Sequence, residues 1–150
     1  MTVGLKLMIN NDMDTNIENG NLYVAFQVKN NIFATPMNDV WGIVAGNQNT
    51  IYTTLPNAPK HAKCIVELDG YLITIVNIPG SNGDIPIMGN FIVLLREGLN
   101  IGILATEVHL ITILADSILE DKITGQKSYA HNGKIYLILD ISQLLKDLDM

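Results

Sequence analysis

The feature that most constrains this chain is the pair Asp69-Gly70, which stands between two apolar runs. Both central residues of a type I′ turn need positive φ, and Asp-Gly is one of the pairs that adopt this turn most readily. The flanking runs, 64–68 and 71–78, are rich in residues that favour strands. The second run is apolar almost throughout, which is typical of a strand buried on both faces. The stretch 55–78 therefore predicts a β-hairpin.

A second set of the same signals indicates a duplicated β-unit. Gly-Asn-Leu-Tyr-Val at 20–24 recurs as Gly-Asn-Phe-Ile-Val at 89–93, an offset of 69 residues. Further matches are Asn31-Ile32 with Asn100-Ile101 at the same offset, Val40 with Val108 one residue early, and Asp69-Gly70 with Asn132-Gly133 at an offset of 63. We therefore expect residues 20–80 and 89–141 to form two similar units.

Alternating apolar residues and turn residues predict short strands along most of the chain. The expected elements are strands at 22–28 and 32–35, a short turn or helical step at 36–40 before the apolar residues 41–44, and one helical turn within 116–128. Residues 51–55 lead into the stretch 55–78. Turn residues at 79–84 mark the internal boundary. Apolar residues at i, i+3, i+4 and i+7 predict a terminal helix over 141–148, with Ser142 as its cap. The predicted class is all-β with one short C-terminal helix.

Composition limits the classes of partner and compartment. The 150 residues suit one domain, and 16% charged residues is low for a soluble protein, so we expect partners to cover part of the surface. The net charge of −6 and the single arginine, Arg96, argue against nucleic-acid binding. One cysteine allows no internal disulfide. The sequence has no signal-peptide core and no membrane-spanning run, which favours a cytoplasmic protein without direct membrane insertion.

Residues that could carry catalysis or bind a metal are scattered. His61, His109 and His131 occur in separate elements, and no nucleotide-binding, metalloprotease or nucleophile-elbow motif is present. We therefore expect neither an enzyme nor a cofactor or metal. Cys64 follows two lysines that could activate its thiol, but a buried inert cysteine is the more common situation. The polar residues 1–19 predict a flexible N-terminal segment.

The order of these motifs resembles the CheW-like domain, the coupling module of bacterial chemotaxis. The matching stretches are 23–26 with 33–37 and Val40, 102–104 with Glu107-Val108, and 132–141 with Leu144-Leu145. The resemblance covers residues from about 20 to 148. It implies a single domain over 20–150, built from two five-stranded SH3-like barrels. Their expected ranges are about 20–80 and 85–141, followed by the terminal helix 141–148.

The resemblance also implies a function and contact residues. The family's role is that of a non-catalytic adaptor between the regulatory domain of the chemotaxis histidine kinase and the cytoplasmic tip of chemoreceptors, recruited to membrane receptor arrays. By matching positions, a receptor groove between the barrels would be lined by Thr35, Val40, Ile43 and Val108. The alternative is that Val40 and Val108 belong to the barrel core. The kinase contact would lie around Cys64, Asp69, Gly70 and Tyr71.

Two positions depart from the family pattern. Asp69 stands where the family has an arginine at the corner of its first hairpin, and Gly42 stands where the acidic partner of that arginine is common. Both ends of an expected ion pair are thus absent together. These departures favour, as an alternative, a diverged CheW-like module with another signalling partner. A nucleic-acid-binding or ligand-binding barrel is a further alternative, which the acidic composition disfavours.

Overall fold

The computed structural model describes residues 21–46, 50–54, 62–78, 91–96 and 100–147 of the chain. Several expectations fall wholly or partly outside these ranges: the flexible segment 1–19, the start of the stretch 55–78, the boundary turn 79–84, the first residues of the repeat at 89–93, and the last residue of the terminal helix, Leu148.

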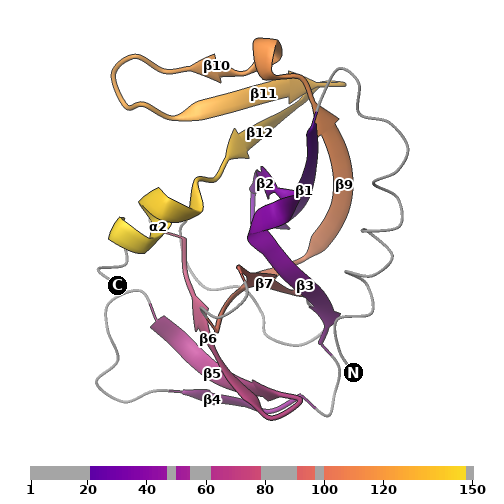
Figure 1. Cartoon of the computed structure of the whole chain (residues 1–150), viewed down its shortest axis with the longest axis vertical. Coiled ribbons are helices and arrows are strands. Elements are labelled where there is room, and N and C mark those ends of the chain that lie inside the picture. Colours follow the sequence, from indigo (N-terminus) through magenta and orange to yellow (C-terminus); the bar gives the residue numbers. More distant parts are fainter. Residues whose placement is uncertain (1–20, 47–49, 55–61, 79–90, 97–99, 148–150) are drawn as a thin grey trace.

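The described residues form short strands, two 3₁₀ turns and one helix (Figure 1). In chain order the elements are β1 (Asn21–Val28), β2 (Asn31–Pro36), η1 (Met37–Asp39), β3 (Val40–Ala45), β4 (Tyr52–Thr54), β5 (Ala62–Leu68), β6 (Tyr71–Val76), β7 (Phe91–Leu95), β8 (Ile101–Ala105), β9 (Glu107–Ile113), η2 (Ala115–Ser117), β10 (Leu119–Glu120), β11 (Lys127–His131), β12 (Lys134–Ile138) and α2 (Ile141–Asp147). The all-β prediction with a short terminal helix is confirmed.

Two sheets hold these strands, and both have the same order. Barrel one is the sheet β4-β5-β6-β8-β7-β3, and barrel two is the sheet β10-β11-β12-β2-β1-β9. The orders coincide when β1–β6 are matched with β7–β12, so the duplication seen in the sequence is present in the topology. Over the described residues each sheet has six strands where five were expected, because the short strands β4 and β10 pair at an outer edge.

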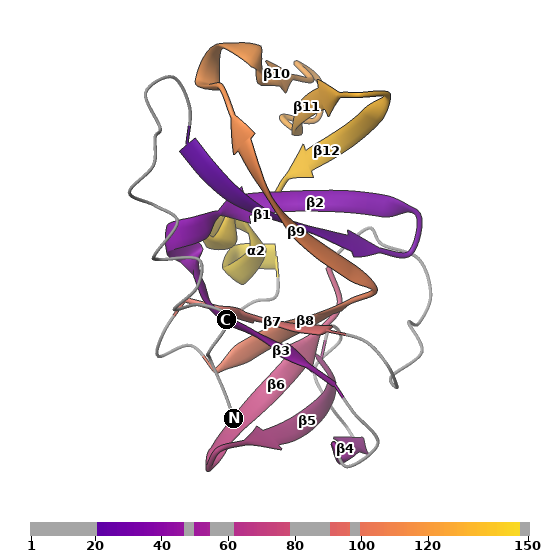
Figure 2. The ribbon, with the colours of Figure 1, turned by 90° about the vertical axis from the view of Figure 1, so that its right-hand side faces the viewer.

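Each barrel takes one hairpin from the other half of the chain. The β1–β2 hairpin pairs with β9 and β12, and the β7–β8 hairpin pairs with β3 and β6. Figure 2 shows β1, β2 and β9 in one layer and β3, β7 and β8 in a second layer beneath it. The sheets therefore differ from the expected ranges of 20–80 and 85–141, which kept each barrel within one half. The reason is that strand pairing between distant segments leaves no local pattern in the sequence.

Register shows how closely the two halves correspond. Val40 pairs with Leu95, and Val108 pairs with Phe26, so Val40 and Val108 occupy equivalent positions, as their spacing predicts. The match of Ile32 with Ile101 is displaced by one residue, because Ile101 pairs with Leu95 as Phe33 pairs with Phe26. The loop of the second hairpin is one residue shorter, which accounts for this displacement.

The two hairpin turns have the backbone that the sequence predicts. The φ angles are 50° at Asp69 and 86° at Gly70, and 50° at Asn132 and 78° at Gly133. Positive φ at both central residues is the requirement of a type I′ turn. The prediction of paired hairpins from Asp-Gly and Asn-Gly is therefore confirmed.

Between the two sheets lies an apolar region that we call the central layer. On β1, Val24 and Phe26 point into it, whereas Ala25 points into the interior of barrel two. The opposite faces of one strand are thus both buried. By contrast, β6 is buried on both faces only in part, since Tyr71 and Leu72 at its start are exposed. The neighbouring β8 pairs only with Thr74 and Ile75, so the start of β6 projects beyond its neighbour.

Helix α2 closes the described chain and packs with Ile141 and Leu144 on the same core cluster as the central layer. Its cap differs from the prediction. Asp140, not Ser142, supplies the capping oxygen, since its Oδ1 accepts hydrogen bonds from the backbone N–H of Ser142 at 2.9 Å and of Gln143 at 3.4 Å. The prediction of Ser142 as the cap is wrong, because the helix begins one residue before it.

Candidate functional site

The four residues expected in a receptor groove all face the central layer. In antiparallel sheets, directly paired residues point to the same face. Each expected residue pairs with a strand residue of the central cluster: Thr35 with Val24, Val108 with Phe26, Val40 with Leu95 and Ile43 with Val93. The structure therefore brings all four residues to the region between the two barrels.

Burial separates these four residues. Thr35, Val40 and Ile43 are buried, whereas Val108 is half-buried. For Val40 this favours the alternative of a core residue. The groove assignment itself stays a prediction. Thr35 is unusual because its fully buried hydroxyl finds no hydrogen-bond partner within the described part of the chain, a situation that costs about 1–3 kcal/mol.

The residues expected at a kinase contact divide into one buried and three exposed positions. Cys64 is buried inside barrel one, which favours the alternative of a core cysteine. Asp69, Gly70 and Tyr71 are exposed at the end of the hairpin. We call these three residues, together with Leu72 and Trp41, the barrel-one tip.

Two contributors to the barrel-one tip were missed from the sequence. Leu72 is 63% exposed although it belongs to an apolar run. Trp41 lies at a β-bulge, where the register shifts between Val40 and Gly42. A bulge re-aims its side chain, and the ring of Trp41 meets that of Tyr71 edge-on at a centroid distance of 5.4 Å. No pattern in the sequence signals the bulge, since it depends on the pairing with β7.

The two departures from the family pattern differ in environment. Asp69 is exposed in the turn, whereas Gly42 is buried in β3 opposite Leu94. Arg96, the single arginine, instead pairs with Asp39, and their side chains meet at 3.2 Å. Both side chains are partly exposed to solvent, so the pair contributes at most about 1 kcal/mol.

The histidines do not converge on a metal-binding arrangement. His109 lies 3.4 Å from the hydroxyl of Tyr136, and His131 stacks on Tyr129, while His61 lies outside the described residues. Within the described ranges, no group of three His, Cys, Asp or Glu side chains could hold a metal ion. Likewise, no helix in the described ranges is long and apolar enough to cross a membrane.

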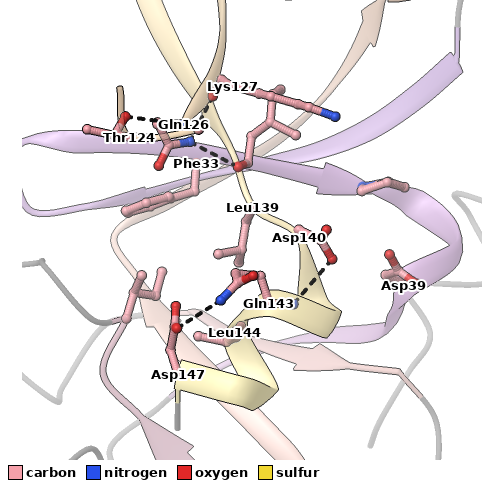
Figure 3. Close-up of a pocket in the computed structure, with 14 residues that line it drawn as sticks. Phe33, Asp39, Thr124, Gln126, Lys127, Leu139, Asp140, Gln143, Leu144 and Asp147 are labelled. Carbon is pink, nitrogen blue, oxygen red and sulfur yellow. Dashed lines mark hydrogen bonds between the residues drawn. The ribbon is translucent and has the colours of Figure 1, made fainter. Parts of the chain in front are cut away.

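A pocket of about 830 Å³ lies between α2, the β2–η1 corner and the turn 121–126 (Figure 3). We call it the α2 pocket. Its apolar lining includes Phe33, Pro36, Leu139 and Leu144, and the charged side chains that line it among the described residues are Asp39, Asp140, Asp147 and Lys127. The sequence does not predict this pocket, because its walls come from segments far apart in the chain.

Comparisons with known proteins agree with this architecture. The model of the CheW-like domain family matches residues 22–149. A search of curated proteins found no match. Among solved structures, the chain is similar to the crystal structure of the scaffolding protein TtCheW from Thermoanaerobacter tengcongensis, with a TM-score of 0.66 and 19% identity over 81% of this chain and 89% of that chain. At this identity the structural likeness shows the fold, and the family match spans nearly all described strands: the chain belongs to the CheW-like domain family.

Proposed function

We propose that this protein is a non-catalytic adaptor in chemotaxis, which couples the cytoplasmic tip of chemoreceptors to the regulatory domain of the chemotaxis histidine kinase. The observation that carries this proposal is the family match over 22–149. The similarity to a scaffolding protein supports it. In this function the protein acts in the cytoplasm, and receptor arrays recruit it to the membrane.

The receptor contact is proposed at the rim of the central layer. Val108 is the accessible member of the four expected groove residues, and Leu110 beside it on the same face is also half-buried. Val40, Ile43 and Thr35 would support this rim from beneath. A helical receptor tip could add its apolar face to Val108 and Leu110, as amphipathic helices do in apolar grooves.

The kinase contact is proposed at the barrel-one tip. Aromatic and large aliphatic side chains often dominate binding energy. Tyr71 and Leu72 are exposed beside the turn, and the half-buried Trp41 contacts the ring of Tyr71. The T-shaped contact of the two rings holds Tyr71 in place before binding, which lowers the entropy lost on association.

Calorimetric titration against an isolated kinase regulatory domain tests this assignment. We expect Tyr71→Ala with Leu72→Ala to weaken kinase binding at least tenfold, because truncating a central anchor costs more than about 1.4 kcal/mol. Ile135→Ala is the matched control, since Ile135 occupies the position of Leu72 in barrel two and is equally exposed, at 63%. Equal losses in both proteins would contradict a kinase contact at the barrel-one tip.

A second titration tests the receptor contact with a peptide of the receptor tip. Val108→Lys should abolish receptor binding and leave kinase binding unchanged, because it places a charge on the proposed apolar rim. If the receptor peptide binds Val108→Lys as well as the wild type, the rim is not the receptor site.

Asp69 favours one refinement, a diverged partner. A misplaced charge at an interface can cost several kcal/mol, so a kinase that expects an arginine at this corner should bind weakly. We therefore expect weak binding of a kinase from a typical CheW-containing system and tighter binding of the cognate kinase. Binding of the typical kinase at about 1 μM or tighter would show that the protein is an ordinary coupling protein.

A further inference from the structure

The α2 pocket combines an apolar floor with a negative rim. Phe33 and Leu139 lie toward its floor, and Asp140 and Asp147 project from the two ends of α2 (Figure 3). The described side chains that line it include three carboxylates and one ammonium group. Asp39 is already in an ion pair, whereas neither carboxylate at α2 forms one with a basic side chain of the described chain. A suitable occupant therefore has an apolar side chain next to a positive charge.

Hydrogen bonds hold the two carboxylates of α2 in place before anything binds. Gln143 Nε2 donates to Asp147 Oδ1 at 3.0 Å. Asp140 Oδ1 caps the helix and accepts from the backbone N–H of Ser142 at 2.9 Å. These donors are neutral, so the negative charge of both carboxylates remains available to a cation. A rim that is already ordered loses little entropy when a ligand arrives.

The turn 121–126, beside the pocket, is held by its own hydrogen bonds. Asp121 Oδ1 accepts from the backbone N–H of Ile123 at 2.8 Å and of Thr124 at 3.1 Å. Backbone hydrogen bonds from Gly125 N–H to the Asp121 carbonyl and from Asp121 N–H to the Gln126 carbonyl close the turn. The bonds from Thr124 and Ile123 also lower the pKa of the Asp121 carboxyl below its usual 3.8, so the carboxylate stays charged at neutral pH. The turn is therefore a rigid support for the side chains at its tip.

The tip of this turn carries the chemistry that the pocket requires. Ile123 is 95% exposed, the largest exposed fraction among the described large apolar side chains, and Lys122 beside it is exposed as well. Ile123 does not line the pocket of its own chain, whereas the next residue, Thr124, does. An exposed apolar side chain and an apolar pocket thus lie next to each other on one surface.

Such a surface is complementary to a second copy of itself. In a two-fold symmetric dimer both copies use the same surface, so a protruding side chain of each copy can enter the pocket of the other. The interface then closes, since both protruding side chains and both pockets are used at once. The charges agree with this arrangement, because Lys122 beside Ile123 would meet the carboxylates at the pocket rim.

We propose that two copies of this chain form such a dimer, in which Ile123 of each copy enters the α2 pocket of the other and Lys122 lies beside the carboxylate of Asp147 in that copy. The dimer removes from water an isoleucine side chain that the monomer leaves exposed. The pocket, with a volume of about 830 Å³, has room for this side chain. This inference does not depend on the proposed chemotaxis function.

Sedimentation equilibrium of the full chain tests whether the dimer forms. Concentrations from about 10 μM to 1 mM cover the affinity expected of a small interface with one apolar anchor in each copy. Ile123→Ser should raise the dissociation constant at least about tenfold, because it removes both anchors of the dimer at once. Leu72→Ser is the matched control, since Leu72 is also an exposed aliphatic residue but lies at the barrel-one tip, and it should leave the constant unchanged. A wild type that stays monomeric at the highest concentration, or an Ile123→Ser variant that associates as the wild type does, would overturn the proposal.

A charge exchange tests the contact between Lys122 and Asp147. Lys122→Glu alone and Asp147→Lys alone should each raise the dissociation constant at least about tenfold, because like charges then face each other on both sides of the two-fold axis. Asp147 is chosen rather than Asp140, which caps the helix. An equimolar mixture of the two variants should dimerise as the wild type does, since each contact between unlike copies then joins opposite charges again.

The same mixture distinguishes the two-fold dimer from other assemblies. A mass of two chains that does not increase further with concentration supports the proposal. Larger assemblies that grow with concentration would overturn it, because they require a head-to-tail contact that does not close. A mixture that stays as dissociated as each variant alone would also overturn it, since the two charges then do not meet across the interface.

Discussion

Inside barrel one, the paired positions Val66 and Ile73 carry aliphatic side chains, whereas the equivalent positions of barrel two carry Tyr129 and Tyr136. On the strands that face these positions, the difference in side-chain size is reversed. Barrel one has Leu94 beside Gly102, and barrel two has two alanines at the corresponding pair, Ala25 and Ala34. Large rings thus accompany small neighbours in barrel two, and medium side chains accompany Leu and Gly in barrel one.

The difference shows that two barrels with the same strand order can have interiors of different composition, provided that large side chains on one strand face small side chains on another. It also changes connectivity. Barrel one shares a single apolar cluster with the central layer, whereas the interior of barrel two forms a cluster of its own. The two halves of a duplicated chain have therefore kept their topology while their side chains diverged in compensating groups.

The largest expected effect comes from adding volume at Gly102. A Cβ atom there would lie 2.9 Å from Ile92 Cγ2 and 3.2 Å from Ile73 Cγ2, which is closer than van der Waals contact. We expect Gly102→Val to lower the free energy of unfolding by about 3 kcal/mol, because an already filled core must shift. Barrel two carries a Cβ at the equivalent residue, Ala34. An unchanged urea midpoint for Gly102→Val would show that barrel one has spare room and that the comparison of volumes fails.

A smaller effect, equal in both barrels, is expected at the hairpin turns. Gly70 and Gly133 have φ angles of 86° and 78°, and a Cβ at either would meet nothing within 4 Å. The cost of Gly70→Val or Gly133→Val is therefore backbone strain alone, about 2 kcal/mol in each case. Denaturant titration measures both variants. A clear difference between them would show that the two turns are not equivalent.

The smallest effect concerns the edge strands, where Tyr52 of barrel one corresponds to Ile118 of barrel two. The hydroxyl of Tyr52 is buried without a hydrogen-bond partner in the described part of the chain, and burial, with a smaller contribution from Cys64, raises the pKa of Tyr52 above its usual 10.0. The unfolded chain then ionises first as pH rises. The associated stability is present below pH 10.0 and is lost as pH increases through the pKa of the folded state.

Tyr52→Phe should remove this alkaline loss and raise stability at neutral pH by up to about 1 kcal/mol, because it deletes an unsatisfied polar group. Urea midpoints between about pH 8 and 11, a range that brackets the usual tyrosine pKa, measure the effect. If Tyr52→Phe and the wild type lose stability in parallel over this range, the tyrosine is not responsible.

Local signals in the sequence predicted the local structure well. Asp69-Gly70 and Asn132-Gly133 predicted two turns that both have the required φ, because the turn type depends on two adjacent residues. The prediction of Ser142 as a helix cap was wrong by two positions. Asp140 and Ser142 both suit a cap, and only the point where β12 ends selects between them.

The candidate contact residues were predicted less completely. Thr35, Val40, Ile43 and Val108 were expected to line a receptor groove; their strand pairings turn all four toward the central layer, and the groove itself stays a prediction. Their accessibility could not be predicted, because it depends on how closely the two layers pack. Leu72 was likewise predicted to belong to a buried run, but it is exposed and lies before the part of β6 that pairs with β8.

The amino-acid sequence by itself determined the strand-forming segments, the turns between them and the twofold repetition of the pattern. These properties depend on backbone conformation and side-chain alternation over a few residues. Only the tertiary structure decided that each barrel contains a hairpin from the other half of the chain, and only the tertiary structure forms the central layer and the α2 pocket. Pairing and packing between distant segments determine these features, and their free energy depends on surfaces that exist only after the strands have come together.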